Sequence, residues 1–411
     1  MKDLAQPWPR VIILMDMNCF FAAVEQQDNP FWHNRPVAVT NGKQGTTIIT
    51  SSYEARAYGI KTGMRLKEAR QLCPELIQAP SRPYRYAEIS TNIMAALQSI
   101  TPDLEVYSVD EAFLDATHCQ SLLGSPLDIA KQVKQVVSNV SGLTCSVGVS
   151  GDKTTAKYAA KLHKPDGLTL IEPWKAEQTL APQAVTEISG INKGIANFLK
   201  DYGVITCGDM KKIPISIPAK RFGNVGRRIW LMAQGKDPES VQVNVKPPKT
   251  IGHGKVMPPQ TNELTTILTY FQHMSEKVAA RLRKHQYKAS HFYIGLKIQQ
   301  GWLQTKTRLS SDTDDGHILF AICRQFTMQH WQGQGVWQVQ VTALDPHTEQ
   351  QADLFIDSNK TQQRSKLNTT VDNINQRYGE FTIAPLRLID RSSMPNVIAP
   401  AWKPFGHRKT I

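Results

Sequence analysis

The amino-acid sequence predicts a multidomain α+β protein. At 411 residues the chain is longer than one hydrophobic core usually supports, which indicates about two to four domains. Segments typical of strands and helices alternate up to about residue 175, as in a mixed sheet covered by helices. Short helical segments follow up to residue 234, and residues 251–345 have the pattern of a βαββαβ unit. We therefore expect a sheet domain, a helical domain and a second sheet domain, in that order.

Local hydrophobic patterns predict the elements of the first part. Short runs rich in β-branched residues predict strands, and apolar residues spaced by three or four predict helices. In the last of these helices Lys153, Lys157 and Lys161 are spaced by four and share one face. The expected order is a strand at 11–15, a helix at 19–26, strands at 36–39 and 46–50, helices at 64–72 and 86–99, a strand at 104–109, a helix at 129–140, a strand at 144–149 and a helix at 154–162.

The later elements change in character. Residues 186–199 favour a helix, a glycine-containing turn and a second helix. Residues 241–259 carry four prolines and little periodicity, which indicates a linker between domains. After Asp345 no pattern predicts a further core. The last unit is expected to contain strands at 252–257, 291–298, 304–309 and 336–344 and helices at 264–284 and 317–330.

Two acidic clusters, far apart in the chain, follow apolar runs. Asp16 follows residues 11–15, and Asp110 and Glu111 follow residues 104–109. If the two strands are neighbours, the three acids converge at one sheet edge, where a hard divalent cation with oxygen ligands would relieve their repulsion. Two such ions about 3.5–4 Å apart are the usual arrangement for exchanging phosphate esters. Either cluster alone is better explained as a solvated turn after a strand, and only the two clusters together favour a metal site.

The composition favours a polyanionic partner and a reducing compartment. The net charge is +13 and the pI is near 9.4. No apolar stretch approaches the ~18–20 residues that span a membrane, and residues 1–7 have no signal-peptide pattern. We therefore expect a cytoplasmic protein without a membrane segment. The cysteines form no CxxC pair for zinc or redox chemistry, and they are Cys19, Cys73, Cys119, Cys145, Cys207 and Cys323.

Residues 16–25 (DMNCFFAAVE) and 108–113 (SVDEAF) resemble the Y-family of translesion DNA polymerases. Over residues 1–345 the most similar type is the bacterial DNA polymerase IV type. The resemblance implies a right-hand polymerase that copies damaged templates with low fidelity, using deoxynucleotides and primer–template DNA. The implied domains are a palm at 1–28 and 80–175, fingers at 29–79, a thumb at 176–240, a linker at 241–250, a βαββαβ little finger at 251–347 and a tail at 348–411.

The resemblance also implies the roles of the acids. Asp16 and Asp110 should bridge two Mg²⁺ ions, for which Mn²⁺ can substitute. Glu111 should lie beside the ion that activates the primer 3′-hydroxyl, and the Met17 carbonyl should complete the site of the other ion. Asn18 replaces an Asp of many relatives, but the family does not rely on that side chain as a metal ligand.

Further resemblances concern the nucleotide. Phe21 matches the steric gate, an aromatic ring that excludes a 2′-hydroxyl, and Phe20 competes with it for this role. Either ring is otherwise explained as a core residue. Four residues match contacts to the triphosphate, with Lys157 as a second candidate lysine, although such residues also occur on solvated faces. They are Thr50, Tyr53, Arg56 and Lys164.

Residues 188–196 resemble a helix-hairpin-helix whose turn amides bind DNA phosphates. The residues concerned are Gly190, Asn192, Lys193 and Gly194. Asn192 stands where the motif usually has its second glycine, so we expect a strained left-handed conformation there. Three arginines should add basic charge to the thumb, and these are Arg221, Arg227 and Arg228.

The end of the chain combines two subfamily features. Gln351, Leu354 and Phe355 lie in a QxxLF-type peptide that resembles the motif for docking on the replicative sliding clamp. The alternative is that Leu354 and Phe355 cap the little-finger core. Residues 371–379 resemble the corresponding region of the catalytic subunit of polymerase V. We expect a monomer, for which this resemblance also allows regulatory protein partners of the SOS type.

Two other functions share some of these sequence features. A non-catalytic Y-family adaptor would bind DNA and the clamp, but such relatives lack the acids that this chain keeps at Asp16, Asp110 and Glu111. A nucleotide cyclase can also carry Asp-Glu on a hairpin. A cyclase, however, needs neither a basic thumb nor a later βαββαβ unit.

Overall fold

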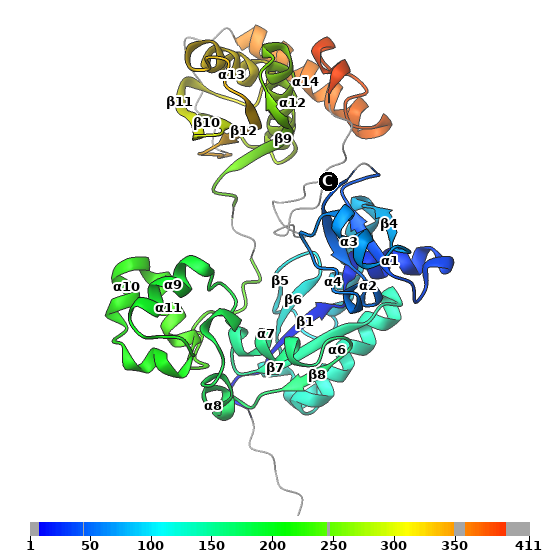
Figure 1. The fold of residues 1–411 in the computed structure, drawn as a ribbon, viewed down its shortest axis with the longest axis vertical. Coiled ribbons are helices and arrows are strands. Elements are labelled where there is room, and N and C mark those ends of the chain that lie inside the picture. Colours follow the sequence, from blue (N-terminus) through cyan, green and yellow to red (C-terminus); the bar gives the residue numbers. More distant parts are fainter. Residues whose placement is uncertain (1–7, 44, 245–246, 349–357, 392–411) are drawn as a thin grey trace, which may run out of the picture. The chain divides into compact units, whose positions relative to one another are not determined.

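The computed structural model describes residues 8–43, 45–244, 247–348 and 358–391 (Figure 1). The chain divides into two compact units near residue 245, and each is described by itself. None of the helices in the described ranges is long and apolar enough to cross a membrane.

A five-stranded sheet forms the centre of the first unit. Its order is β5 (Leu104–Val106), β6 (Glu111–Asp115), β1 (Ile12–Met17), β7 (Cys145–Ser150) and β8 (Leu168–Leu170). Side chains of β1 alternate between two apolar cores, as the two-residue period of a strand requires. Ile13 and Met15 pack with α4 (Pro83–Leu97) and α6 (Pro126–Ser141), whereas Ile12 and Leu14 pack with α7 (Lys153–Leu162).

A glycine allows α7 to lie close to this sheet. A Cβ atom at Gly148 of β7 would stand 2.1 Å from the Ala156 carbonyl oxygen and 2.2 Å from the Ala160 nitrogen. Any larger residue would push α7 away from the sheet. Because α7 carries Lys157, this close packing also fixes the helix that faces the acids.

The acidic pair lies on a hairpin, which corrects the expected single strand at 104–109. Strand β5 ends at Val106, and β6 begins at Glu111. The amides of Tyr107 and Ser108 both donate to the Glu111 carbonyl, at 3.0 and 3.1 Å, and these bonds close the turn. Asp110 therefore lies in the turn, between two paired strands, rather than at the end of one strand.

Two smaller parts complete the first unit. One is a three-stranded sheet with the order β3 (Ile48–Ser51), β2 (Val37–Thr40) and β4 (Ile77–Pro80), which packs on short helices. The other is a helical part with a core around Leu180, Leu199 and Met210. The remaining elements are α1 (Phe20–Asp28), η1 (Pro30–Trp32), α2 (Tyr53–Ala57), α3 (Leu66–Leu72), η2 (Thr117–Cys119), α5 (Gln120–Leu123), η3 (Pro173–Lys175), α8 (Ala176–Leu180), η4 (Val185–Glu187), α9 (Lys193–Asp201), η5 (Gly208–Lys212), α10 (Ser216–Phe222) and α11 (Asn224–Met232).

The second unit has the expected βαββαβ order. Its antiparallel sheet runs β11 (Gly301–Thr313), β10 (Ala289–Ile298), β12 (Val336–Ala343) and β9 (Ile251–Thr261). Helices α12 (Leu264–Lys284) and α13 (Gly316–His330) cover one face, with Phe271, Phe292 and Leu319 in the core between them and the sheet. Alternate residues of β11 are exposed on the other face.

The tail is attached to this unit by charge rather than by an apolar face. Helix α14 (Ser358–Tyr378) pairs Arg364 with Asp315 and Asp372 with Arg283, each at 2.6 Å. Leu388 of η6 (Leu386–Asp390) is fully buried. Hydrophobic periodicity could not predict this docking, because the ion pairs of Arg364 and Asp372 leave no periodic signal.

Candidate active site

The three acids meet at one edge of the central sheet, as expected. Asp16 of β1 is paired directly with Glu111 of β6. The amide of Met17 donates to the Asp110 carbonyl at 2.9 Å, which brings the turn against the end of β1. Directly opposite residues of an antiparallel pair have Cα atoms about 4.5–5.5 Å apart, so these side chains share one small region.

Each carboxylate has a polar partner in this region. The Ser108 hydroxyl donates to Asp110 Oδ1 at 2.6 Å, and Lys164 Nζ lies 2.5 Å from Asp16 Oδ1. Lys157 forms an ion pair with Glu111. The acids therefore face lysines in this arrangement, and within the described ranges no three His, Cys, Asp or Glu side chains form a ready-made metal cage.

The electrostatics of the acids nevertheless fit a divalent cation. Burial raises the pKa of Asp16 to about 6, against the attraction of Lys164 and with added repulsion from Glu111. Burial also raises the pKa of Asp110, although the Ser108 hydrogen bond opposes this. Carboxylates that are costly to ionise alone are stabilised by a cation among them, and oxygen donors suit Mg²⁺.

Asn18 is turned away from the acids. Its amide nitrogen donates to Thr144 Oγ1 at 3.0 Å, and its amide oxygen accepts from the Ser146 hydroxyl at 2.9 Å. The side chain is 4% exposed. An amide can both donate and accept, whereas an ionised Asp can only accept. Asn18 thus stabilises the junction of β1 and β7.

The two candidate gate residues occupy different environments. Phe20 is buried in the core, so its ring does not face the site. Phe21 is partly exposed and stacks on Tyr86, with ring centroids 4.3 Å apart and planes 16° apart. The Tyr86 hydroxyl donates to the Glu25 carboxylate at 2.6 Å, which holds the ring on which Phe21 stacks. Sequence reasoning missed this role of Tyr86. The periodicity of residues 86–99 predicted only a helix that begins at this residue.

The candidate triphosphate contacts come from the three-stranded sheet and its helix. Thr50 lies on β3, and Tyr53 and Arg56 lie on α2, whose N-terminus is capped by Ser52. The Arg56 guanidinium lies 4.8 Å from the centre of the Tyr53 ring. The Tyr53 hydroxyl is buried and has no hydrogen bond of ordinary geometry to any described residue. A buried donor without a partner is costly, so this hydroxyl is suited to a ligand oxygen.

A cavity of about 310 Å³ adjoins Asp16 and Lys164. Three lysines and two acids lie around it. Its lining consists of Asp16, Lys157, Tyr158, Lys161, Lys164, Glu187 and Ser189. The surplus of positive charge suits phosphate oxygens. A second cavity of about 300 Å³ on α13 has no acidic lining residue and lies in the other unit.

The candidate DNA-binding turn has an unstrained Asn192, which corrects the expected left-handed conformation. Gly190 has a φ of 96°, but Asn192 is extended, with φ −84° and ψ 174°. Its side-chain oxygen accepts from the Ile195 amide at 3.0 Å and caps α9. Asparagine is among the preferred N-cap residues. Lys193 and Gly194 form the first turn of α9, where amides can bind an anion.

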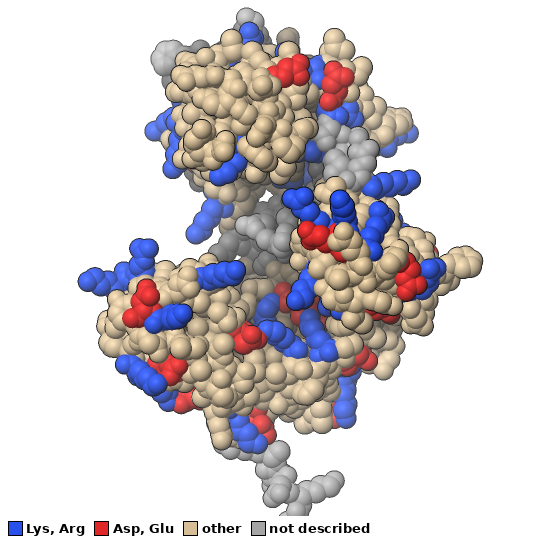
Figure 2. Space-filling view, in the orientation of Figure 1, with Lys and Arg blue, Asp and Glu red and all other residues tan. Residues whose placement is uncertain are grey.

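The three arginines of the helical part do not share one role. Arg221 and Arg227 are exposed on α10 and α11. Arg228 instead pairs with Asp237 at 2.9 Å and also with Glu239, so its charge is neutralised within the protein. In Figure 2 lysine and arginine side chains project from the surface of this part, interspersed with a few acids.

The exposed sheet face of the second unit is a candidate nucleic-acid surface that sequence reasoning missed. Lys306 and Arg308 of β11 are exposed and lie opposite Tyr293 and His291 of β10. Lys297 lies 5.7 Å from the centre of the Trp302 ring on the same sheet. The sequence signal that could have predicted this surface was the two-residue alternation of side chains over residues 302–310. The predicted clamp residues Gln351, Leu354 and Phe355 lie outside the described residues.

Comparison with known proteins agrees with this arrangement. The impB/mucB/samB family matches residues 15–161, and the C-terminal domain of that family matches residues 248–354. The chain belongs to the Y-family of DNA polymerases, whose right-hand architecture it shares.

Individual relatives match over most of their length. The chain is 35% identical to DNA polymerase IV of Moorella thermoacetica, with 90% of this chain and 94% of that protein covered. It is 33% identical to DNA polymerase IV of Serratia proteamaculans, with coverage of 83% and 98%. A solved Y-family DNA polymerase chimera, Dbh-Dpo4(243-245)-Dbh, matches with a TM-score of 0.70 and 26% identity, covering 81% of this chain and 98% of that one.

Proposed function

We propose that this protein is a translesion DNA polymerase, which adds deoxynucleotides to a primer 3′-hydroxyl opposite damaged template bases. The observation that carries the proposal is the meeting of Asp16 on β1 with Glu111 on β6 and with Asp110 in the turn before β6. An adaptor without catalytic function would have no need of these three buried or half-buried acids. The close relatives called DNA polymerase IV support the same activity.

Y-family polymerases generally depend on divalent metal. Asp16, Asp110, Glu111 and the Met17 carbonyl are the groups that would hold two Mg²⁺ ions, or Mn²⁺ in their place. Bound there, the ions would supply charge neutralisation at the phosphorus and acidify the 3′-hydroxyl. Lys164 and Lys157, which now pair with two of these acids, are then free to bind phosphate oxygens.

The side chains around the acids position the nucleotide. The Tyr53 hydroxyl, the Arg56 guanidinium and Thr50 come from α2 and β3, and Lys164 follows α7. Charge-assisted bonds from a planar guanidinium and an ammonium fix the triphosphate. Phe21, supported by Tyr86, provides the wall against which a 2′-hydroxyl would collide.

The remaining parts hold the DNA without reading its sequence. We assign the palm to residues 1–28 and 80–175, the fingers to 29–79, the thumb to 176–240 and the little finger to 251–347. The turn at Gly190 and the first amides of α9 suit a backbone phosphate. On the second unit, the exposed sheet face with Lys306 and Arg308 suits the phosphates of the duplex. The peptide with Gln351, Leu354 and Phe355 is proposed to bind the sliding clamp.

Primer extension on templates with single defined lesions tests the proposal. We expect the full-length protein with Mg²⁺ to extend primers on undamaged templates and past at least one lesion. Extension should also require all the acids. Binding of primer–template DNA with no extension on any template, with Mg²⁺ or Mn²⁺, would support the adaptor instead.

A further inference from the structure

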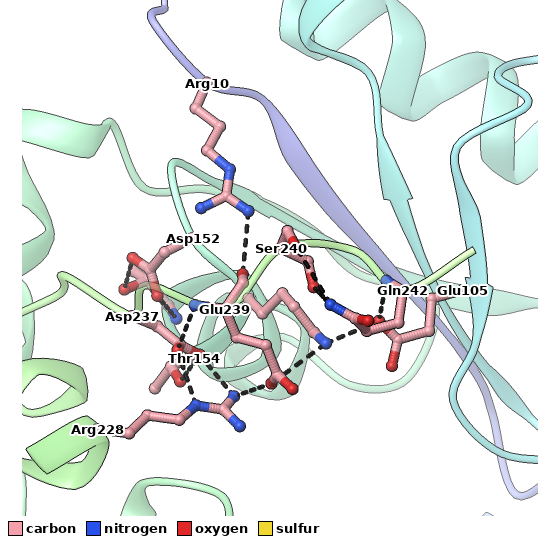
Figure 3. Close-up of polar contacts among 11 residues, drawn as sticks. Arg10, Glu105, Asp152, Thr154, Arg228, Asp237, Glu239, Ser240 and Gln242 are labelled. Atoms are coloured by element: carbon pink, nitrogen blue, oxygen red, sulfur yellow. Dashed lines mark hydrogen bonds and ion pairs between the residues drawn. The ribbon is translucent and has the colours of Figure 1, made fainter. Parts of the chain in front are cut away.

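A buried ionic junction lies where the segment that follows α11 meets α7. Asp237 is its centre, and its side chain has 0% exposure. Its carboxylate accepts two bonds from Arg228 of α11, each at 2.9 Å, and one from the Thr154 hydroxyl of α7 at 2.8 Å. Figure 3 shows these side chains converging from α11, from α7 and from the segment that follows α11.

The next residues of this segment are also attached to the palm. The Glu239 carboxylate lies 3.4 Å from Lys153, and its carbonyl accepts from Arg10 at 3.0 Å. Lys153, which is 3% exposed, pairs with Glu105 of β5 at 2.7 Å. The same Glu105 oxygen accepts a hydrogen bond from the main-chain amide of Gln242 at 2.8 Å (Figure 3).

Ion pairs and apolar contacts both hold this junction together. Lys153 and Arg228 pair with three carboxylates (Glu105, Asp237 and Glu239), and Arg10 adds its hydrogen bond to the Glu239 carbonyl. Val241 packs on the back of the palm sheet, against the core formed by Ile12, Leu14, Phe113, Ala156 and Ala160. Removing one partner of a buried ion pair leaves an uncompensated charge and strongly lowers stability. The junction therefore favours one defined position of residues 237–242.

We infer that this junction is a positioning device, which holds residues 237–242 on the palm and makes Gln242 the point from which the chain runs to the second unit. The helix α11 ends at Met232, and β9 begins at Ile251. A chain running free from Met232 could span about 65 Å, whereas one starting at Gln242 spans only about 30 Å. The junction therefore halves the reach of the little finger without touching substrate.

The consequence for DNA is a higher effective concentration of the little finger at the duplex. This consequence rests on the proposed function, whereas the attachment of residues 237–242 does not. Effective concentration falls as roughly the −3/2 power of tether length, so doubling the chain beyond Gln242 should weaken primer–template binding about threefold.

Two matched insertions in the full-length protein test the inference. A nine-residue Gly-Ser insertion between Gln242 and Val243 lengthens the chain beyond the junction, and we expect an about threefold higher dissociation constant for primer–template DNA. The same insertion between Lys236 and Asp237 lies before the junction, so the dissociation constant should stay unchanged. Equal weakening by both insertions, or by neither, overturns the inference.

Amide hydrogen exchange on the unmodified protein provides a test that needs neither catalysis nor a variant. The Gln242 amide should exchange at least about a hundredfold more slowly than the Lys249 amide, because only the first is held by Glu105. Glu105→Leu with Lys153→Met, which replaces the buried pair by apolar groups, should remove this protection. Asp28 and Arg85 form an ion pair at 3.0 Å elsewhere in the unit. Asp28→Leu with Arg85→Met removes that pair and should leave the protection of the Gln242 amide unchanged. Equal exchange of Gln242 and Lys249 in the unmodified protein contradicts the inference.

Discussion

Phe20 and Phe21 are neighbours in the chain, but their rings have opposite environments. A helix begins at Phe20, and the first ring is buried in the core while the second is partly exposed and stacks on Tyr86. The sequence motif favoured Phe21 as the gate. Only the structure shows why Phe20 is poorly placed for that role.

Phe21→Ala should admit ribonucleotides. Discrimination here rests on excluding the 2′-hydroxyl, so removing the ring should raise ribonucleotide insertion at least about tenfold relative to deoxynucleotide insertion. Single-nucleotide insertion kinetics measure this ratio. Phe20→Leu is the control, since it should lower thermal stability and leave sugar selectivity unchanged. If Phe21→Ala keeps the original selectivity, the gate lies elsewhere.

Single residues also show where sequence reasoning stops. The convergence of Asp16 with Glu111 could be predicted because both acids adjoin apolar strands. The extended conformation of Asn192 could not, because a cap and a left-handed turn residue look alike in sequence. Asp237 could not be found either, since its partner Thr154 lies 83 positions away and neither residue belongs to a motif.

At the scale of elements, β11 carries a testable surface. Its exposed residues Lys306 and Arg308 should contact DNA phosphates on the open face of the second sheet. Binding should therefore fall steeply with salt and depend little on sequence. Lys306→Ala or Arg308→Ala should each lower the slope of log affinity against log salt by about 0.9. Lys366→Ala on α14 removes an equal charge from another surface and should leave the slope unchanged; equal slopes in all variants would reject this surface.

Helix α12 buries a histidine beside cations. Burial lowers the pKa of His273 to about 3, and repulsion by Lys277 and Lys255 adds to this. In the unfolded chain His273 binds a proton near pH 6.5, whereas in the folded unit it stays neutral at that pH. The folded unit therefore loses stability as the pH falls below the pKa of His273 in the unfolded chain.

The pH dependence can be measured against His273→Gln. Between pH 6.5 and pH 4.5 the free energy of unfolding of the second unit should fall by about 2 kcal/mol more in the unmodified protein than in the variant. The slowest-exchanging amides of β10 report this free energy in the full chain. Parallel pH profiles for the two proteins would show that His273 is not held neutral.

At the scale of the whole molecule, the sequence predicted the order of the parts better than their attachments. Hydrophobic periods identify strands and helices, and the βαββαβ order of the second unit follows from them. The attachments depend on ion pairs between distant residues, such as Arg283 with Asp372. Such pairs leave no periodic signal, so the docking of α14 was absent from the sequence interpretation.

The proposed clamp-binding peptide, with Gln351, Leu354 and Phe355, precedes α14 in the sequence. Leu354→Ala with Phe355→Ala should abolish stimulation by the sliding clamp and leave distributive synthesis on short primers unchanged. Burial of these two side chains is worth ~1.5–3 kcal/mol each before ordering costs, which gives a modest affinity. Gln362→Ala with Gln363→Ala is the control. Loss of thermal stability in the first variant would instead place Leu354 and Phe355 in the core.

The central claim is that Asp16, Asp110 and Glu111 form the catalytic centre of a polymerase, and Asp110→Ala tests it most directly. Primer extension and primer–template binding should be measured together, with Asp103→Ala, an exposed acid of the same unit, as the control. We predict that Asp110→Ala lowers extension by more than about a hundredfold and changes the DNA dissociation constant by less than about tenfold, because the carboxylate serves the reaction and not the DNA. Extension by Asp110→Ala at a rate close to that of the unmodified protein would contradict the account.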